Sequence, residues 1–129
     1  MDFEKLKLFA SASALEGAAS LWHPAAPEIC NGIGAAFFPA GLRQMLDRRN
    51  PAIQAPAAIH DLDYTRGGSV ADRLRADRKF LKNCFRAGNY LYRSVDFRRY
   101  LVWAKGVKFY ILLRLGGGAA FNYRKERAL

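Results

Sequence analysis

Apolar positions recur at helical spacing in several stretches of the chain. Near the N-terminus this spacing predicts a helix from about Phe3 to Ala19, which two nearby prolines would end. A second helix is expected from Pro56, a residue tolerated in a first helical turn, to Gly67, which suits a C-terminal cap. No segment alternates well enough to form a long strand. The expected fold class is therefore mainly α.

Two more helices are predicted further along the chain. Ser69 and Asp72 form a Ser-x-x-Asp pattern typical of a helix start. The short Gly67-Gly68 joint before them would fold this helix back as an antiparallel partner of the preceding one. A long apolar C-terminal helix is expected over about 95–115. We interpret it as a core helix or a subunit contact, with a helix lying on a lipid interface as the alternative.

The chain reads as one domain. Its 129 residues fit a single core, with the helix pair within about 30–88 and the C-terminal helix after it. An N-terminal helix precedes this pair, followed by a glycine-bearing irregular segment from residue 28 to 54, in which a short helix over 41–48 is an option. No signal peptide or membrane-spanning helix is expected, because the most apolar stretch, 101–121, contains charged residues. Export by a non-classical route is compatible with these features.

Charge is distributed unevenly along the chain. Residues 1–72 carry a net charge of −2, and residues 73–129 carry +12. This asymmetry indicates an anionic partner. A phospholipid membrane surface is favoured over nucleic acid, because no helix-turn-helix, zinc or RNA-binding signature is present. The basic side chains expected to bind lipid or another anion are Arg73, Arg75, Arg78, Lys79, Lys82, Arg98 and Arg99.

One acidic residue interrupts an apolar helix face. Asp77 lies in the middle of the face formed by Val70, Leu74, Leu81 and Cys84. A buried carboxylate is costly unless a partner satisfies it, and the preceding helix offers His60 and Tyr64 on one face. We expect His60 Nδ1 within about 3.2 Å of Asp77, and a second hydrogen bond from Tyr64. Such a pair leaves the other ring nitrogen able to act as a base, although a purely structural pair is the alternative.

A second acidic residue, Asp61, points about 100° around the helix from His60. Backbone carbonyls of Asn31, Gly32 and Gly34 could meet its carboxylate, and Ca²⁺ takes carboxylate and carbonyl oxygens together. A cation beside a histidine base would polarise an ester carbonyl. The alternative is an exposed helix acid beside an ordinary turn. Cys30 and Cys84 are too few for a disulfide scaffold and are interpreted as small buried residues.

These residues resemble a known family. His60-Asp61-Leu62-Asp63-Tyr64 is similar to the His-Asp-x-x-Tyr signature of phospholipase A2, and Ala76-Asp77-x-x-Phe80 to the segment that carries its second aspartate. The likeness covers roughly residues 30–85 and is closest to the cysteine-poor branch, as in viral capsid and some bacterial or phage proteins. Ala57 and Asp63 replace the flanking cysteines of secreted members, and Asn-Gly-Ile-Gly is a loose counterpart of their calcium loop.

The resemblance implies a calcium-dependent hydrolase that cleaves acyl esters of phospholipids. Under it, His60 activates water, Asp77 orients His60 with help from Tyr64, and Asp61 with the Asn31–Gly34 segment binds Ca²⁺. The implied partner is a phospholipid membrane surface. The alternative is a catalytically silent phospholipase A2-like component that assembles with other proteins, in a virion or a secretion apparatus.

Overall fold

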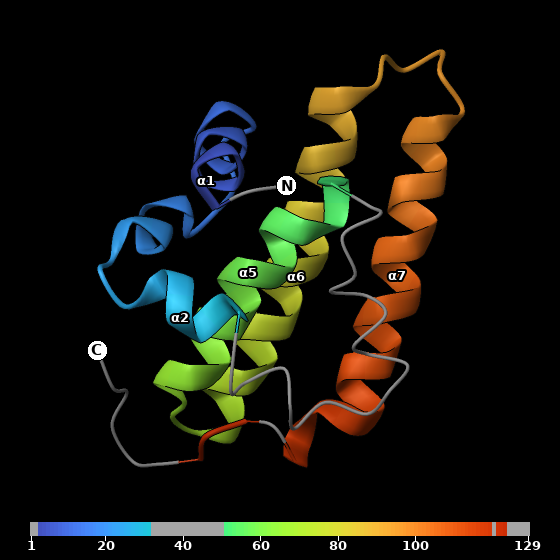
Figure 1. Cartoon of the computed structure of the whole chain (residues 1–129). Helices are drawn as coiled ribbons and strands as arrows, with labels where there is room; N and C mark the ends of the chain where they lie inside the picture. Colours follow the sequence, from blue (N-terminus) through green and yellow to red (C-terminus); the bar gives the residue numbers. More distant parts are fainter. Residues whose placement is uncertain (1–2, 32–50, 120, 124–129) are drawn as a thin grey trace.

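The computed structural model of the chain describes residues 3–31, 51–119 and 121–123. Within these ranges the elements are helices (Figure 1), which confirms the prediction of a mainly α fold. The short helix considered over 41–48 lies outside the described residues. The elements are α1 (Phe3–Ala12), η1 (Ala18–Trp22), α2 (Ala26–Asn31), α5 (Pro51–Arg66), α6 (Val70–Leu91), α7 (Arg98–Gly116) and η2 (Gly117–Ala119).

Helix α5 lies between the other elements. In Figure 1, α6 runs antiparallel to α5, α7 runs antiparallel to α6 at the far side, and α1 and α2 lie on the opposite side of α5. Because α5 is covered on several sides, residues 52–64 are all buried. Its polar side chains, among them His60, Asp61 and Asp63, therefore belong to the interior of the protein.

The N-terminal helix is shorter than expected. It ends at Ala12 rather than Ala19, because the backbone turns to positive φ at Ala14 (54°) and Gly17 (85°). The Ser13 hydroxyl donates to the Phe9 carbonyl at 2.7 Å and satisfies one acceptor of the last turn. The sequence also gave no sign of α2, a short helix that begins just beyond Pro24.

Helix α5 begins at Pro51, so the expected start at Pro56 is wrong. Pro51 occupies the tolerated first turn, and Pro56 lies inside the helix, where it removes one backbone hydrogen bond. The end of the helix is as expected. The Gly67 N–H donates to the Asp63 carbonyl at 3.0 Å, with φ of 65°. A Cβ at Gly67 would lie 1.8 Å from the Asn122 carbonyl oxygen, so this turn requires glycine.

Helix α6 starts with the expected capping box. The Ser69 hydroxyl accepts from the Asp72 N–H, and the Asp72 carboxylate accepts from the Ser69 N–H. Two parts of the expected interior are different. Val70 is 67% exposed and does not belong to the buried face. Cys84 is buried as expected, whereas Cys30 is only partly buried, and both thiols are free.

Helix α7 is not the long apolar helix that the sequence predicted. Its buried residues are Val102, Gly106 and Leu113, and its basic residues are Arg98, Arg99, Lys105, Lys108 and Arg114. It is therefore a peripheral helix rather than a central core helix (Figure 1). Among the described helices, none combines the length and the apolar character that a membrane crossing requires.

Candidate functional site

The carboxylate of Asp77 lies at the junction of α5, α6 and α7. Its side chain is fully buried. Oδ1 accepts hydrogen bonds from His60 Nε2 at 2.8 Å and from the Tyr64 hydroxyl at 2.6 Å. Oδ2 accepts one from Arg114 Nη1, also at 2.6 Å. His60 and Tyr64 thus both bond to Asp77, and a third helix supplies a cation that the sequence did not indicate.

The ring nitrogen that meets Asp77 is not the expected one. We expected Nδ1, but the structure places Nε2 against the carboxylate. Nε2 is the nitrogen farther from the histidine backbone, so it is the one that can span the gap between α5 and α6. The ring packs on Tyr64, with centroids 4.0 Å apart, and on Phe80 at 5.6 Å. Within the described part of the chain, Nδ1 makes no hydrogen bond.

The electrostatics of the site fix the proton on Nε2. Burial raises the pKa of Asp77, but hydrogen bonds from His60, Tyr64 and Arg114 bring this pKa below its usual value. The carboxylate is therefore ionised at neutral pH and can only accept. Burial and the bond to Asp77 raise the pKa of Tyr64, so its hydroxyl remains a donor. Nε2–H then donates to Asp77, and a neutral ring carries its lone pair on Nδ1.

Two arginines connect α7 to this carboxylate. Arg73 Nη2 donates to the carbonyls of Leu113 at 2.8 Å and Arg114 at 3.2 Å, and its Nε lies 3.4 Å from the Tyr64 hydroxyl. The sequence predicts Arg73 only as a lipid-binding or anion-binding residue and indicates no role for Arg114. A usable signal was present in the sequence: α7 contains no acidic residue to pair with its cations, and Asp77 needed a partner.

Asp61 is buried next to this network but has a different environment. It is 3% exposed, so its interpretation as an exposed helix acid is wrong. Among the described residues, its Oδ1 has no hydrogen-bond partner. Burial raises the pKa of Asp61 to about 8. Burial first and the negative charge of Asp61 second raise the pKa of the Cys30 thiol, on α2, to about 12.

The expected calcium ligands are described only in part. Asn31 is the last residue of α2, and Cys30 beside it bonds through Sγ to the Ala58 carbonyl at 3.5 Å, so α2 ends against α5. Gly32 and Gly34 lie outside the described residues. Within the described ranges, no three His, Cys, Asp or Glu side chains gather as a metal-binding group. A calcium site here would therefore combine Asp61 with backbone carbonyls, and the last carbonyls of a helix have no partner within it.

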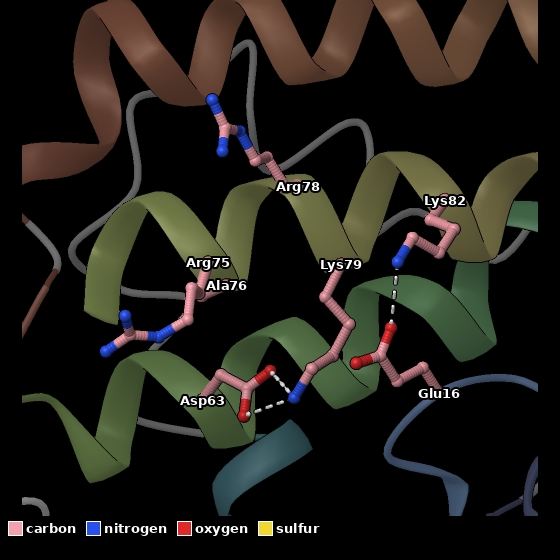
Figure 2. A pocket seen from close by; sticks show the side chains of 7 residues that line it. All are labelled: Glu16, Asp63, Arg75, Ala76, Arg78, Lys79 and Lys82. Carbon is pink, nitrogen blue, oxygen red and sulfur yellow. Dashed lines mark hydrogen bonds and ion pairs between the residues drawn. The ribbon is translucent and has the colours of Figure 1, made fainter. Parts of the chain in front are cut away.

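Four of the basic residues expected to bind anions line one surface pocket. The pocket has a volume of about 300 Å³ (Figure 2). Lys79 points across it to Asp63, with Nζ 3.1 Å from Oδ2, and Lys82 lies 3.5 Å from Glu16. Its other basic lining residues are Arg75, which pairs with Asp72, and Arg78. Acidic neighbours therefore compensate much of the positive charge of this pocket.

The remaining three basic residues lie elsewhere. Arg73 points to the end of α7, as described above. Arg98 bonds to the Asp96 carboxylate at 2.7 Å, and Arg99 bonds to Asn89 at 2.6 Å and lies over the Trp103 ring. The seven residues predicted as one lipid-binding or anion-binding group thus belong to three separate environments.

No protein-family model, curated protein or solved structure matches the chain.

Proposed function

We propose that the protein is a calcium-dependent, phospholipase A2-like hydrolase of phospholipid acyl esters. The observation that carries this proposal is the hydrogen bond of 2.8 Å between His60 Nε2 and Asp77. It orients the ring and stabilises an imidazolium, while Nδ1 makes no hydrogen bond within the described residues. A histidine held in this way is suited to remove a proton from water.

The chemistry assigned to these side chains needs no covalent intermediate. Nδ1 of His60 takes a proton from water as the water oxygen attacks the ester carbonyl carbon. The ionised Asp77 stabilises the imidazolium that forms, and Arg114 and Tyr64 hold the carboxylate in place. When the tetrahedral intermediate collapses, the imidazolium returns the proton to the leaving alkoxide. The products are a fatty acid and a lysophospholipid.

Asp61 fits the requirement for a calcium ligand. Its Oδ1 is buried without a hydrogen-bond partner among the described residues, and its pKa of about 8 means that it holds a proton at neutral pH. A divalent cation would replace that proton and remove the cost of burial. Asp61, with carbonyls of Asn31, Gly32 and Gly34, would hold Ca²⁺. Bound Ca²⁺ supplies positive charge for the lipid phosphate and the developing oxyanion.

The test compares the only two histidines of the chain. Fatty-acid release from mixed phospholipid micelles is measured for wild type, His60→Gln and His23→Gln. His23 is exposed and its Nδ1 accepts from the Ala25 N–H at 3.1 Å, so it serves as the matched control. We expect His60→Gln to lower the rate by about a hundredfold or more, and His23→Gln to leave it unchanged. Circular dichroism checks that both variants are folded.

A second arm tests the metal. A calcium chelator should abolish release by wild type, and Asp61→Asn should remove the dependence of the remaining rate on Ca²⁺. Equal release by wild type and His60→Gln would reject the catalytic proposal. Wild type that releases no fatty acid above background would favour the alternative, a catalytically silent component that keeps the helix pair for assembly with other proteins.

A further inference from the structure

The outward face of α7 carries large exposed apolar side chains along its length, with Lys108 among them. We call the large exposed side chains of this face the outer stripe; they are the N-cap residue Phe97 and, within the helix, Tyr100, Leu101, Val107, Ile111 and Leu115. At about 100° per residue they share one side of the helix, opposite the buried Val102 and Leu113. The exposure is large: Leu115 is 82% exposed and Phe97 is 68% exposed.

Such a face is unusual for a surface helix. Single exposed apolar side chains are common, but a continuous apolar strip marks a surface that contacts a partner or a membrane. Helix α7 has 19 residues, so the stripe is about 28 Å long at 1.5 Å per residue. In Figure 1, α7 lies at the edge of the molecule, with α6 on its inner side. The stripe therefore faces away from the helices that are described.

The charges around the outer stripe indicate an anionic partner. Helix α7 contains five basic residues and no acidic residue. Lys108 lies within the stripe and Lys105 at its border, and neither forms an ion pair with a described residue. On an anionic lipid surface, lysine side chains can reach lipid phosphates while apolar neighbours enter the headgroup boundary.

A second copy of the chain fits this face less well. Two copies related by a two-fold axis would place the same stretch of α7 opposite itself. Lys108 lies next to the midpoint of Arg98–Gly116, so a contact centred on the helix would bury Lys108 against Lys108 of the other copy. Burying two like charges without acidic partners is strongly unfavourable. Anionic lipid avoids this cost because it supplies the counter-charge.

We propose that the outer stripe of α7 docks on an anionic phospholipid surface, with Lys105 and Lys108 pairing with lipid phosphates. This assigns lipid contact to α7 rather than to the basic pocket on α6, where acidic neighbours compensate the cations. The idea that the enzyme meets its substrate at this surface rests on the proposed function. The docking itself requires no ester cleavage, so the two can fail separately.

The experiment measures binding of the full chain to vesicles by sedimentation. Vesicles of phosphatidylcholine alone are compared with vesicles that also contain phosphatidylglycerol, in the presence of a calcium chelator. Ile111→Glu is compared with Leu8→Glu, the same type of change at a 60% exposed position on α1. Wild type should prefer the anionic vesicles and lose affinity as salt rises. Ile111→Glu should weaken binding about tenfold or more, and Leu8→Glu should bind within about twofold of wild type.

A charge variant and an assembly measurement complete the design. Lys105→Gln combined with Lys108→Gln should reduce the preference for anionic vesicles about tenfold to thirtyfold. Equal binding by Ile111→Glu and Leu8→Glu, or no binding of wild type, would overturn the proposal. So would a wild-type dimer in sedimentation velocity that Ile111→Glu converts to a monomer, because the stripe would then belong to a second copy. Vesicle binding by wild type without fatty-acid release would reject only the proposed function.

Discussion

Asp77 on α6 and Asp61 on α5 are both almost fully buried, yet their surroundings are opposite. Asp77 accepts hydrogen bonds from three side chains, one of them a guanidinium. Asp61 has a carboxylate oxygen with no partner among the described residues. The pKa of Asp77 lies below its usual value, and that of Asp61 is raised to about 8. Similar burial thus gives opposite shifts, and the difference arises from the partners of each carboxylate.

The comparison separates two roles that a buried carboxylate can have. The ionised form of Asp77 is stabilised by the fold, so its charge is available to His60 without any ligand. Asp61 instead costs folding free energy whenever it is ionised. Such a cost is expected at a position where a bound cation offsets it, which is the role proposed for Asp61.

The largest predicted effect is the pH dependence caused by Asp61 in the metal-free protein. Its pKa is raised from 3.8 to about 8 on folding, so between these values the folded state keeps a proton that the unfolded chain has lost. The free energy of unfolding therefore falls by about 1.4 kcal/mol per pH unit as pH rises, and the fall stops above about pH 8. Between pH 5 and pH 8 this amounts to about 4 kcal/mol.

The measurement is urea unfolding of wild type and Asp61→Asn over this pH range, with a metal chelator present. Asparagine has a similar shape and does not titrate, so the wild type should lose its stability relative to the variant as pH rises. A difference between the two proteins that stays constant with pH would show that Asp61 is ionised in the folded protein, and it would remove the contrast with Asp77.

The second prediction concerns the arginine that bonds to Asp77, which has no counterpart at Asp61 among the described residues. Replacing Arg114 by methionine leaves Asp77 with two donors and no full positive charge, which should lower the free energy of unfolding by about 2 kcal/mol.

Arg98→Met is the matched control. Arg98 is also on α7 and also bonds to an aspartate, at 2.7 Å, but its side chain is 63% exposed. Solvent screens this exposed pair, so Arg98→Met should change stability clearly less than Arg114→Met. If both variants lose the same free energy of unfolding in urea, the buried contact of Arg114 with Asp77 stabilises the fold no more than the exposed contact of Arg98 with Asp96.

Local chemistry explains which parts of this arrangement could be predicted from the sequence. The Ser69–Asp72 cap and the Gly67 turn depend on neighbouring residues, so their patterns were sufficient. The meeting of His60 and Asp77 follows from helical spacing together with that tight turn. These signals are all contained within about one helix pair.

Long-range packing explains what could not be predicted. Helix α5 extends five residues before Pro56, because burial on several sides offsets the missing hydrogen bond of a proline inside the helix. Arg114 is 37 residues from Asp77, and no local pattern indicates which cation of α7 reaches it. Whether Nε2 or Nδ1 of His60 reaches Asp77 depends on the distance between the axes of α5 and α6. The sequence does not indicate that distance.

The smallest predicted effect concerns Tyr64, whose neutral hydroxyl is one of the three donors to Asp77. Tyr64→Phe keeps the ring and removes the hydrogen bond of 2.6 Å to Asp77, together with the longer one of 3.4 Å from Arg73 Nε, while His60 and Arg114 still bond to the carboxylate. The free energy of unfolding should fall by about 1 kcal/mol, less than for Arg114→Met, because the lost donor carries no charge.

Tyr100→Phe, which removes an exposed bond of 2.8 Å to the Ser94 carbonyl, serves as the control and should change stability less. If Tyr64→Phe lowers stability more than Arg114→Met in urea unfolding, the neutral donor rather than the cation dominates at Asp77. The contrast with Asp61 would then depend on hydrogen bonding rather than on a positive charge.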